Sequence, residues 1–153
     1  MTNLEKEFQL QEILEKEQKM IGLFMGFEMD PEDYPYKLRI PHFIQIEPFL
    51  IPNPMVCSRD YCEWANSYQN GMGHGGYCLS FSSLEFNSNW SWLMVVVEKI
   101  HSLGYRIDMI MTERQTTTNV YADYGVVSKG EKSTLLESTY KSVVDFIKWY
   151  NKH

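Results

Sequence analysis

The sequence predicts an α+β fold, namely a single-domain layered α-β-α sandwich with about three helices and a four-stranded, mostly antiparallel sheet. Three observations predict it. Apolar residues recur at helical spacing near both ends of the chain and once in between. Elsewhere they alternate with a period of two, which indicates half-buried strands. The 153 residues suffice for one ordinary domain, covering 1–153.

The first helix is expected within the N-terminal segment, residues 1–28. Its apolar residues recur near helical spacing at Leu10, Ile13, Leu14, Ile21 and Phe24. Gly22 and Gly26 bracket its end, which we place near residue 25. This pattern is typical of an amphipathic helix docked on a sheet.

The next two segments lack helical signals. All six prolines lie within residues 29–56, and proline fixes φ and removes a donor, so this segment is extended and supplies one or two strands within Tyr36–Ile46. Residues 57–86 are a Cys- and Gly-rich insertion that ends in a strand over Gly76–Phe86.

The last segment, residues 87–153, begins with the most strongly predicted helix. Asn87, Ser88 and Asn89 are N-cap candidates, and Gly104 stands where a glycine commonly ends a helix. The apolar stripe between them consists of Trp90, Leu93, Met94, Val97 and Ile100.

Two strands and a closing helix complete the chain. Alternation predicts strands over Tyr105–Met111 and Val120–Val127. The closing helix is expected from about Glu131 to Tyr150, where apolar residues recur at intervals of three and four.

Charge and composition exclude several classes of protein. With 14 basic and 20 acidic residues, the net charge of −6 argues against a strongly basic nucleic-acid footprint. The longest apolar run, Leu93–Val97, is too short to span a membrane, and the acidic N-terminus is not a signal peptide. Three cysteines do not make a disulfide framework. We expect a cytoplasmic protein without membrane or nucleic-acid partners.

Two segments carry a family resemblance: Trp90–Ile100 (WSWLMVVVEKI) and Tyr140–Asn151 (YKSVVDFIKWYN). They resemble the W-x-W-L-M-x-V-V-E-K-I helix and the closing V-V-x-F-I-K-W-Y-N helix of small phage and prophage proteins. Ile21–Gly26 is similar to the end of their first helix. The chain thus resembles the phage ABA sandwich domain type, a sheet layered between helices. The resemblance implies a phage accessory protein in the bacterial host cytoplasm, and no activity, because the type has no assigned function.

A cluster of potential metal ligands lies in the insertion: Cys57, Cys62, His74 and Cys78, in the pattern C-x4-C-x11-H-x3-C. Thiolates and imidazole suit tetrahedral zinc, and a loop of about a dozen residues between two ligand pairs is reasonable. Zinc sites more often open with C-x2-C, however, and free cysteine is commonly a small buried hydrophobe. We therefore expect no cofactor, with zinc as the alternative.

A second candidate site follows the strand near residues 120–124. The segment Gly125–Ser133 (GVVSKGEKS) has the shape of a P-loop with one residue too many. The extra Glu131 turns Lys132 by about 100° on a helix, which excludes an NTPase. One interpretation that remains is an anion-binding site at a helix start, with Lys129 and Lys132 as the basic groups. A plain turn and helix cap without a ligand is the favoured interpretation.

Aromatic residues suggest a third candidate site. Trp92 falls between the rows of its helix, so it fills either the core, a subunit contact or a ligand stack. Arg106 and Arg114 are close in sequence and would pair a phosphate beside a stacked base. His74, on the glycine-dense loop Gly71–Gly76, is a further potential ligand contact. Core or oligomer packing is the favoured role of Trp92.

Neither a Ser/His/Asp triad nor a catalytic Cys/His pair is recognisable, so we expect no enzyme. The predicted function is that of a non-enzymatic phage accessory protein, directed against host defence and acting by binding. Its best version is a homo-oligomer that sequesters a small anionic, nucleotide-like ligand. The alternatives are an inhibitor that binds a host protein, and a small zinc-stabilised interaction module.

Overall fold

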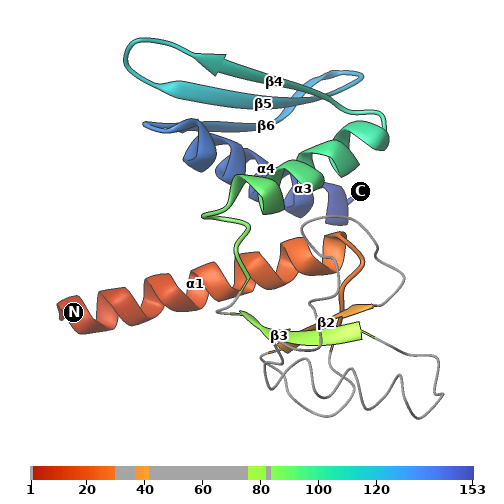
Figure 1. Ribbon diagram of the computed structural model, residues 1–153. Coiled ribbons are helices and arrows are strands. Elements are labelled where there is room, and N and C mark those ends of the chain that lie inside the picture. The colour runs from red at the N-terminus through yellow and green to blue at the C-terminus, as the bar shows by residue number, and fades with distance from the viewer. Residues whose placement is uncertain (1, 30–36, 42–75, 82–83) are drawn as a thin grey trace. The chain divides into compact units, whose positions relative to one another are not determined.

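The computed structural model describes residues 2–29, 37–41, 76–81 and 84–153 (Figure 1). The chain divides into two compact units, residues 1–84 and 85–153. The described residues form three helices and two three-stranded antiparallel sheets, which confirms the predicted α+β class. One sheet lies in each unit, whereas the sequence predicted about four strands in one sheet. The expectation of a single domain over 1–153 stays a prediction.

The first unit consists of one long helix and a small sheet. Helix α1 (Asn3–Phe24) begins with a capping box, in which Thr2 and Glu5 satisfy each other's backbone N–H groups. It ends at the C-cap Met25, where the sequence placed its end. Three antiparallel strands follow in the order β1-β2-β3: β1 (Glu28–Met29), β2 (Lys37–Pro41) and β3 (Gly76–Ser80).

Close packing against α1 depends on Gly22. A Cβ atom added there would lie 2.5 Å from Leu38 Cδ1 and 3.0 Å from Phe27 Cδ2. Only a residue without a side chain permits this approach of the helix to Leu38, which is fully buried. The glycine expected to bracket the helix end therefore also serves as a packing site.

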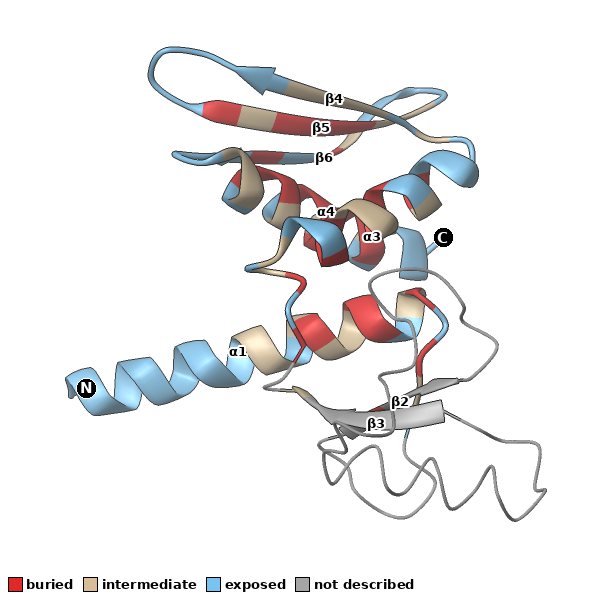
Figure 2. Cartoon of the chain, in the orientation of Figure 1, coloured by how far each residue is buried: buried red, intermediate tan, exposed pale blue. Residues whose placement is uncertain are grey.

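The second unit packs two helices on one sheet. Figure 1 shows α3 and α4 on the same face of a sheet with strand order β4-β5-β6. Its elements are α3 (Trp90–Ser102), β4 (Arg106–Met111), β5 (Thr116–Ala122), β6 (Gly125–Lys132) and α4 (Leu135–Asn151). Figure 2 shows buried residues along β5 and on the helix faces that meet the sheet. The opposite face of the sheet carries no helix of this unit.

The expected strand Val120–Val127 is wrong, because a hairpin turn interrupts it. Strand β5 ends at Ala122, β6 begins at Gly125, and these two residues pair across a two-residue loop. Gly125 has a φ of +125°, a conformation that L side chains rarely adopt. The turn therefore adds a strand that the sequence reading merged with its neighbour.

The start of α4 also differs from the prediction. Residues up to Lys132 continue β6, and the helix starts at Leu135 rather than near Glu131. Thr134 caps it by accepting a hydrogen bond from the Glu137 backbone N–H over 3.2 Å. The predicted start near Glu131 is wrong because strand pairing with β5 extends as far as Lys132.

The buried stripe of α3 is shifted from the one predicted. Trp90, the first helical residue, is 37% exposed, whereas Trp92 is only 7% exposed. The Trp92 ring packs edge-on against Phe86, with ring centroids 5.1 Å apart. The apolar run Leu93–Val97 offers two adjacent helix faces, and the packed face consists of Trp92, Leu93, Val96, Val97 and Ile100.

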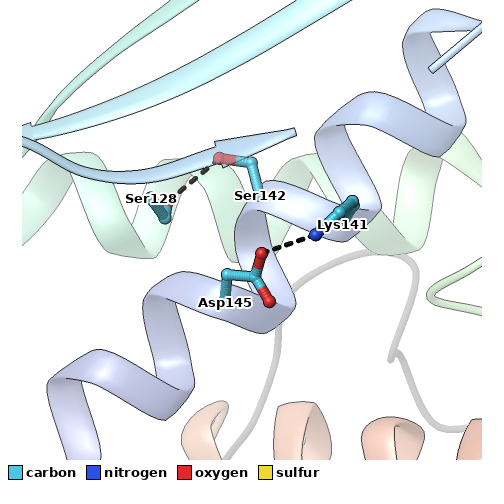
Figure 3. A network of polar contacts seen from close by, with 4 residues as sticks. All are labelled: Ser128, Lys141, Ser142 and Asp145. Atoms are coloured by element: carbon cyan, nitrogen blue, oxygen red, sulfur yellow. Dashed lines mark hydrogen bonds and ion pairs between the residues drawn. The ribbon is translucent and has the colours of Figure 1, made fainter. Parts of the chain in front are cut away.

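Small hydroxyl residues bring α4 close to the sheet. Ser128 and Ser142 share a hydrogen bond of 3.0 Å, drawn in Figure 3. Thr118 bonds Thr139 over 2.9 Å, and both side chains are buried. A Cβ added at Gly130 would clash with the carbonyl group of Ser138. Hydroxyls paired with hydroxyls thus replace bulky apolar contacts at this interface.

Among the helices of the described ranges, none has the length and apolar character needed to cross a bilayer.

Candidate functional site

The candidate site is the face of the β4-β5-β6 sheet that points away from α4. Side chains alternate between the two faces of a strand. The hydroxyls of Thr116, Thr118 and Ser128 bond α4, so their neighbours along the strands belong to the opposite face. We call this the outer face. It comprises Arg106, Asp108, Ile110, Thr117, Asn119, Tyr121, Val126, Lys129 and Glu131.

The centre of the outer face is a row of three residues. Strand register places Asn119 of β5 between Asp108 of β4 and Lys129 of β6. Asn119 is 9% exposed, and its Oδ1 atom is buried without a hydrogen-bond partner among the described residues. A buried amide oxygen without a donor costs stability, so this atom requires an explanation.

Arg106 lies in the neighbouring row, opposite Tyr121 on β5. The guanidinium carbon is 4.0 Å from the centre of the Tyr121 ring, which is a cation–π stack. Arg106 Nη2 also lies 3.5 Å from Asp108 Oδ2. The stack fixes the position of a planar, multiply donating group on the outer face.

The charges of the outer face are paired along each edge strand. On β6, Lys129 Nζ is 2.7 Å from Glu131 Oε1, and on β4, Arg106 is paired with Asp108. These four groups sum to no net charge and place both signs on each edge. The outer face therefore presents an alternating pattern of both signs rather than one dominant charge.

The predicted anion-binding residues do not come together. Arg106 and Lys129 share the outer face, but Arg114 lies in the loop beyond β4, about 17 Å along the strand from Arg106. Lys132 lies three residues from Lys129 on β6, so the two lysines belong to opposite faces.

At two further places the structure shows the alternative that the sequence analysis favoured. The start of α4 is capped by Thr134 and carries Glu137 in its first turn, which is the plain turn and cap of the sequence analysis. Trp92 fills the core beside Phe86, which is the favoured of its sequence-based alternatives.

The proposed zinc ligands Cys57, Cys62 and His74 lie outside the described residues. Cys78 belongs to β3, opposite Arg39 of β2. Within the ranges that the structure describes, no group of three or more metal-ligating side chains is found. Zinc binding by the insertion therefore stays a prediction.

A pocket of about 440 Å³ lies elsewhere in this unit, on the helix side of β4. Ile107 and Met109 of β4 and Val97 of α3 form its apolar lining, and Glu98 and His101 add polar groups. All of these residues belong to α3 and β4, which are consecutive in the chain. These five lining residues include no lysine or arginine.

Aromatic residues that the sequence left without a role gather at the end of α4. Tyr105 meets Phe146 and Trp149 edge-on, with ring centroids 4.9 and 5.9 Å apart. Trp149 stacks on His153 at 4.7 Å, and His153 Nδ1 lies 2.7 Å from the Trp149 carbonyl oxygen. This cluster packs the helix end onto the start of β4.

Sequence reasoning missed Asn119 and Tyr121 as members of a site. The signal was present in the run TTTNVYA, where a polar residue stands between Thr118 and Val120 in a strand with two buried neighbours. It was overlooked because the hairpin was read as one strand, which left Asn119 outside it. Comparisons of the chain with protein-family models, with curated proteins and with solved structures gave no match.

Proposed function

We propose that the protein acts by non-covalent binding rather than catalysis, and that it binds a protein surface through the outer face. One observation carries this proposal. The buried Oδ1 atom of Asn119 lacks a donor at the centre of a sheet face that no helix of its unit covers. The atom is closed off from solvent in the chain alone, so a partner that moves the covering side chains aside and supplies an N–H group would recover the energy that the isolated unit loses.

The charge pattern supports a protein partner over a small anion. An anion would have to displace Asp108 from Arg106 and Glu131 from Lys129. A protein surface brings both signs at once and can complement all four charges without breaking the existing pairs. Tyr and Arg, stacked together here, are also enriched at protein interfaces.

The second candidate function is the binding of a nucleotide-like anion. It is favoured by the presence of Arg106, Tyr121 and Lys129 on one face, since the exposed guanidinium offers both charge and a planar surface. A thermal-shift screen with ATP and a cyclic dinucleotide tests it. A rise in melting temperature that Arg106→Ala abolishes would favour this function over protein binding.

The biological setting belongs to the same proposal. The resemblance of Trp90–Ile100 and Tyr140–Asn151 to phage helices supports a phage accessory protein that acts on its host. The partner would then be a host protein or a component of the phage itself. A zinc-stabilised module remains the third candidate and depends on Cys57, Cys62, His74 and Cys78.

Site-specific photo-crosslinking in a bacterial lysate tests the protein-binding proposal. A benzophenone amino acid replaces Ile110, which is 46% exposed on the outer face. The matched control carries it at Lys148, an exposed position on α4. We expect discrete adducts from position 110 that are absent from position 148. Absence of adducts at position 110, or identical adducts at both positions, would overturn the proposal.

A further inference from the structure

We propose that the outer face pairs with the same face of a second copy of this chain, with Asn119 on the two-fold axis. This inference rests on the proposed function, because it names the protein surface that the outer face binds. The register of the strands, the charges on them and the amide oxygen without a donor at their centre support it.

Symmetry leaves two simple ways to place one outer face on another. If the two-fold axis runs across the strands, Asp108 meets Asp108 and Lys129 meets Lys129, which is repulsive. If the axis runs along β5, strand β4 of one copy meets β6 of the other, so that Asp108 faces Lys129 twice. The charge pattern therefore selects the axis along β5.

The same axis runs along β5, so Thr117, Asn119 and Tyr121 each face their own copy, with Asn119 in the middle. A residue on a two-fold axis meets itself, so it must be self-complementary. The side-chain amide meets this condition, because each Asn119 carries an N–H group for the other's Oδ1. Asn119 Oδ1 is closed off from solvent in the single chain, so the side chains that cover it must move aside when two outer faces meet. Sheets pack face to face about 10 Å apart, and two amides turned outward, each reaching about 3.5 Å from its Cα, then leave about 3 Å, a hydrogen-bond distance.

The rim of the outer face agrees with this arrangement. Val126, which is 52% exposed, would meet the aliphatic stem of the partner's Arg106, its counterpart in the same row. Ile110 would likewise meet the stem of the partner's Glu131. Long charged side chains cover apolar neighbours with their stems while their charged ends stay in water.

The size of the face predicts a weak dimer. Three strands about 4.8 Å apart and about six residues long give a footprint of roughly 14 by 20 Å. A stable interface buries about 800 Å² on each partner, which is more than this footprint supplies. Association should therefore depend on protein concentration, and it should exchange readily with another protein that fits the same face.

Sedimentation equilibrium of full-length charge variants tests the inference. Asp108→Lys places two lysines opposite each other twice in the dimer, and Lys129→Asp does the same with two aspartates. We expect each variant to weaken self-association about tenfold or more. An equimolar mixture of the two, and the double variant, should recover it, because both restore opposite charges at each contact. Lys141→Asp and Asp145→Lys, on an exposed ion pair of α4 (Figure 3), are matched controls.

Asn119→Val distinguishes a loss of self-association at the interface from a loss caused by poor folding. Valine suits a central strand and removes the unpaired amide, so the melting temperature should rise while self-association falls. A protein that is more stable and less associated cannot be explained by unfolding. A variant that keeps its association would show that Asn119 does not lie on the axis.

Three results would overturn the inference. The first is a wild-type protein that shows no dimer at about 1 mM, a concentration that corresponds to a binding free energy of only about −4 kcal/mol. The second is single variants that behave like the α4 controls, and the third is a double variant that does not recover self-association. If position 110 still cross-links a different protein in these cases, the inference fails and the proposed function stands. If position 110 cross-links nothing, both fail.

Discussion

Arg106 and Tyr121 face each other across β4 and β5, with the guanidinium carbon 4.0 Å above the centre of the ring. Strand β4 begins at Arg106, and this contact helps to hold β4 in register with β5. The planar guanidinium lies on the aromatic ring instead of extending into solvent. The same pair gives the outer face its only aromatic side chain within the described strands. The Arg106–Tyr121 stack therefore contributes both to the stability of the β4–β5 pairing and to the surface that a partner would contact.

Replacing Arg106 by lysine separates the stack from the charge. Lysine keeps the positive charge near Asp108 but loses the planar surface, so Arg106→Lys should cost about 0.5–1 kcal/mol, the usual range for an exposed cation–π pair. Urea denaturation measures it. Arg106→Ala as the second variant should cost slightly more; equal stability of all three proteins would show that the stack contributes nothing.

Gly130→Ala should force β6 and α4 apart. A Cβ atom there meets the backbone carbonyl of Ser138, which cannot rotate away as a side chain would. Overpacking of this kind costs about 1–3 kcal/mol. Thermal and urea unfolding check it, with the exposed Ser133→Ala expected to stay within about 0.5 kcal/mol of wild type. A stable Gly130→Ala protein would contradict the close packing described here.

The bond between Ser128 and Ser142 offers a double-mutant cycle. Each single alanine variant leaves one buried hydroxyl without its partner and should cost about 1–3 kcal/mol. Removing both hydroxyls takes away the unsatisfied group, so the double variant should lose less than the sum of the two singles. Strict additivity in chemical denaturation would show that the two hydroxyls do not interact.

Lys99 gives a pH-dependent prediction. Burial lowers the pKa of Lys99 below its ordinary value of 10.5, because desolvation disfavours the ammonium. The native state therefore releases the proton first, and the energetic cost of the buried charge is fully present below the folded pKa. As the pH rises from there towards 10.5, that cost is relieved and stability rises.

Lys99→Met removes this titration and serves as the reference. The free energy of unfolding of the wild type, measured relative to the variant, should increase between neutral pH and about pH 10.5. Denaturation of both proteins at the two pH values provides the comparison. A constant difference, or one that moves the other way, would show that the ammonium is not desolvated in the folded protein.

Patterns local to one element allowed much of the fold to be predicted. The end of α1 near Met25 and the start of α3 after Asn89, whose side chain accepts a hydrogen bond from the Ser91 backbone N–H, follow directly from glycine and capping signals. Strand β4 follows from alternation. These features depend on neighbours within a few residues.

Features that depend on distant residues were not predictable from local patterns. Strand β6 contains Gly125, Lys129 and Gly130, which are poor strand formers, and it exists because β5 and α4 hold it on two sides. Predicting the outer face requires knowledge of the register of three strands. This register places Lys129 beside Asn119 and Lys132 on the opposite face. We grouped Arg114 with Arg106 because the two are close in sequence. The extended strand β4 lies between them and separates them in space.

The side-chain amide of Asn119 is the most direct reporter of the outer face as a binding surface. In ¹H–¹⁵N NMR spectra its two N–H resonances are identified by their loss in Asn119→Asp. We expect these resonances to shift, and their protons to exchange more slowly with water, as the protein concentration rises or a partner protein is added. If the protein associates or binds while the Asn119 amide resonances stay unchanged, the outer face is not its binding surface.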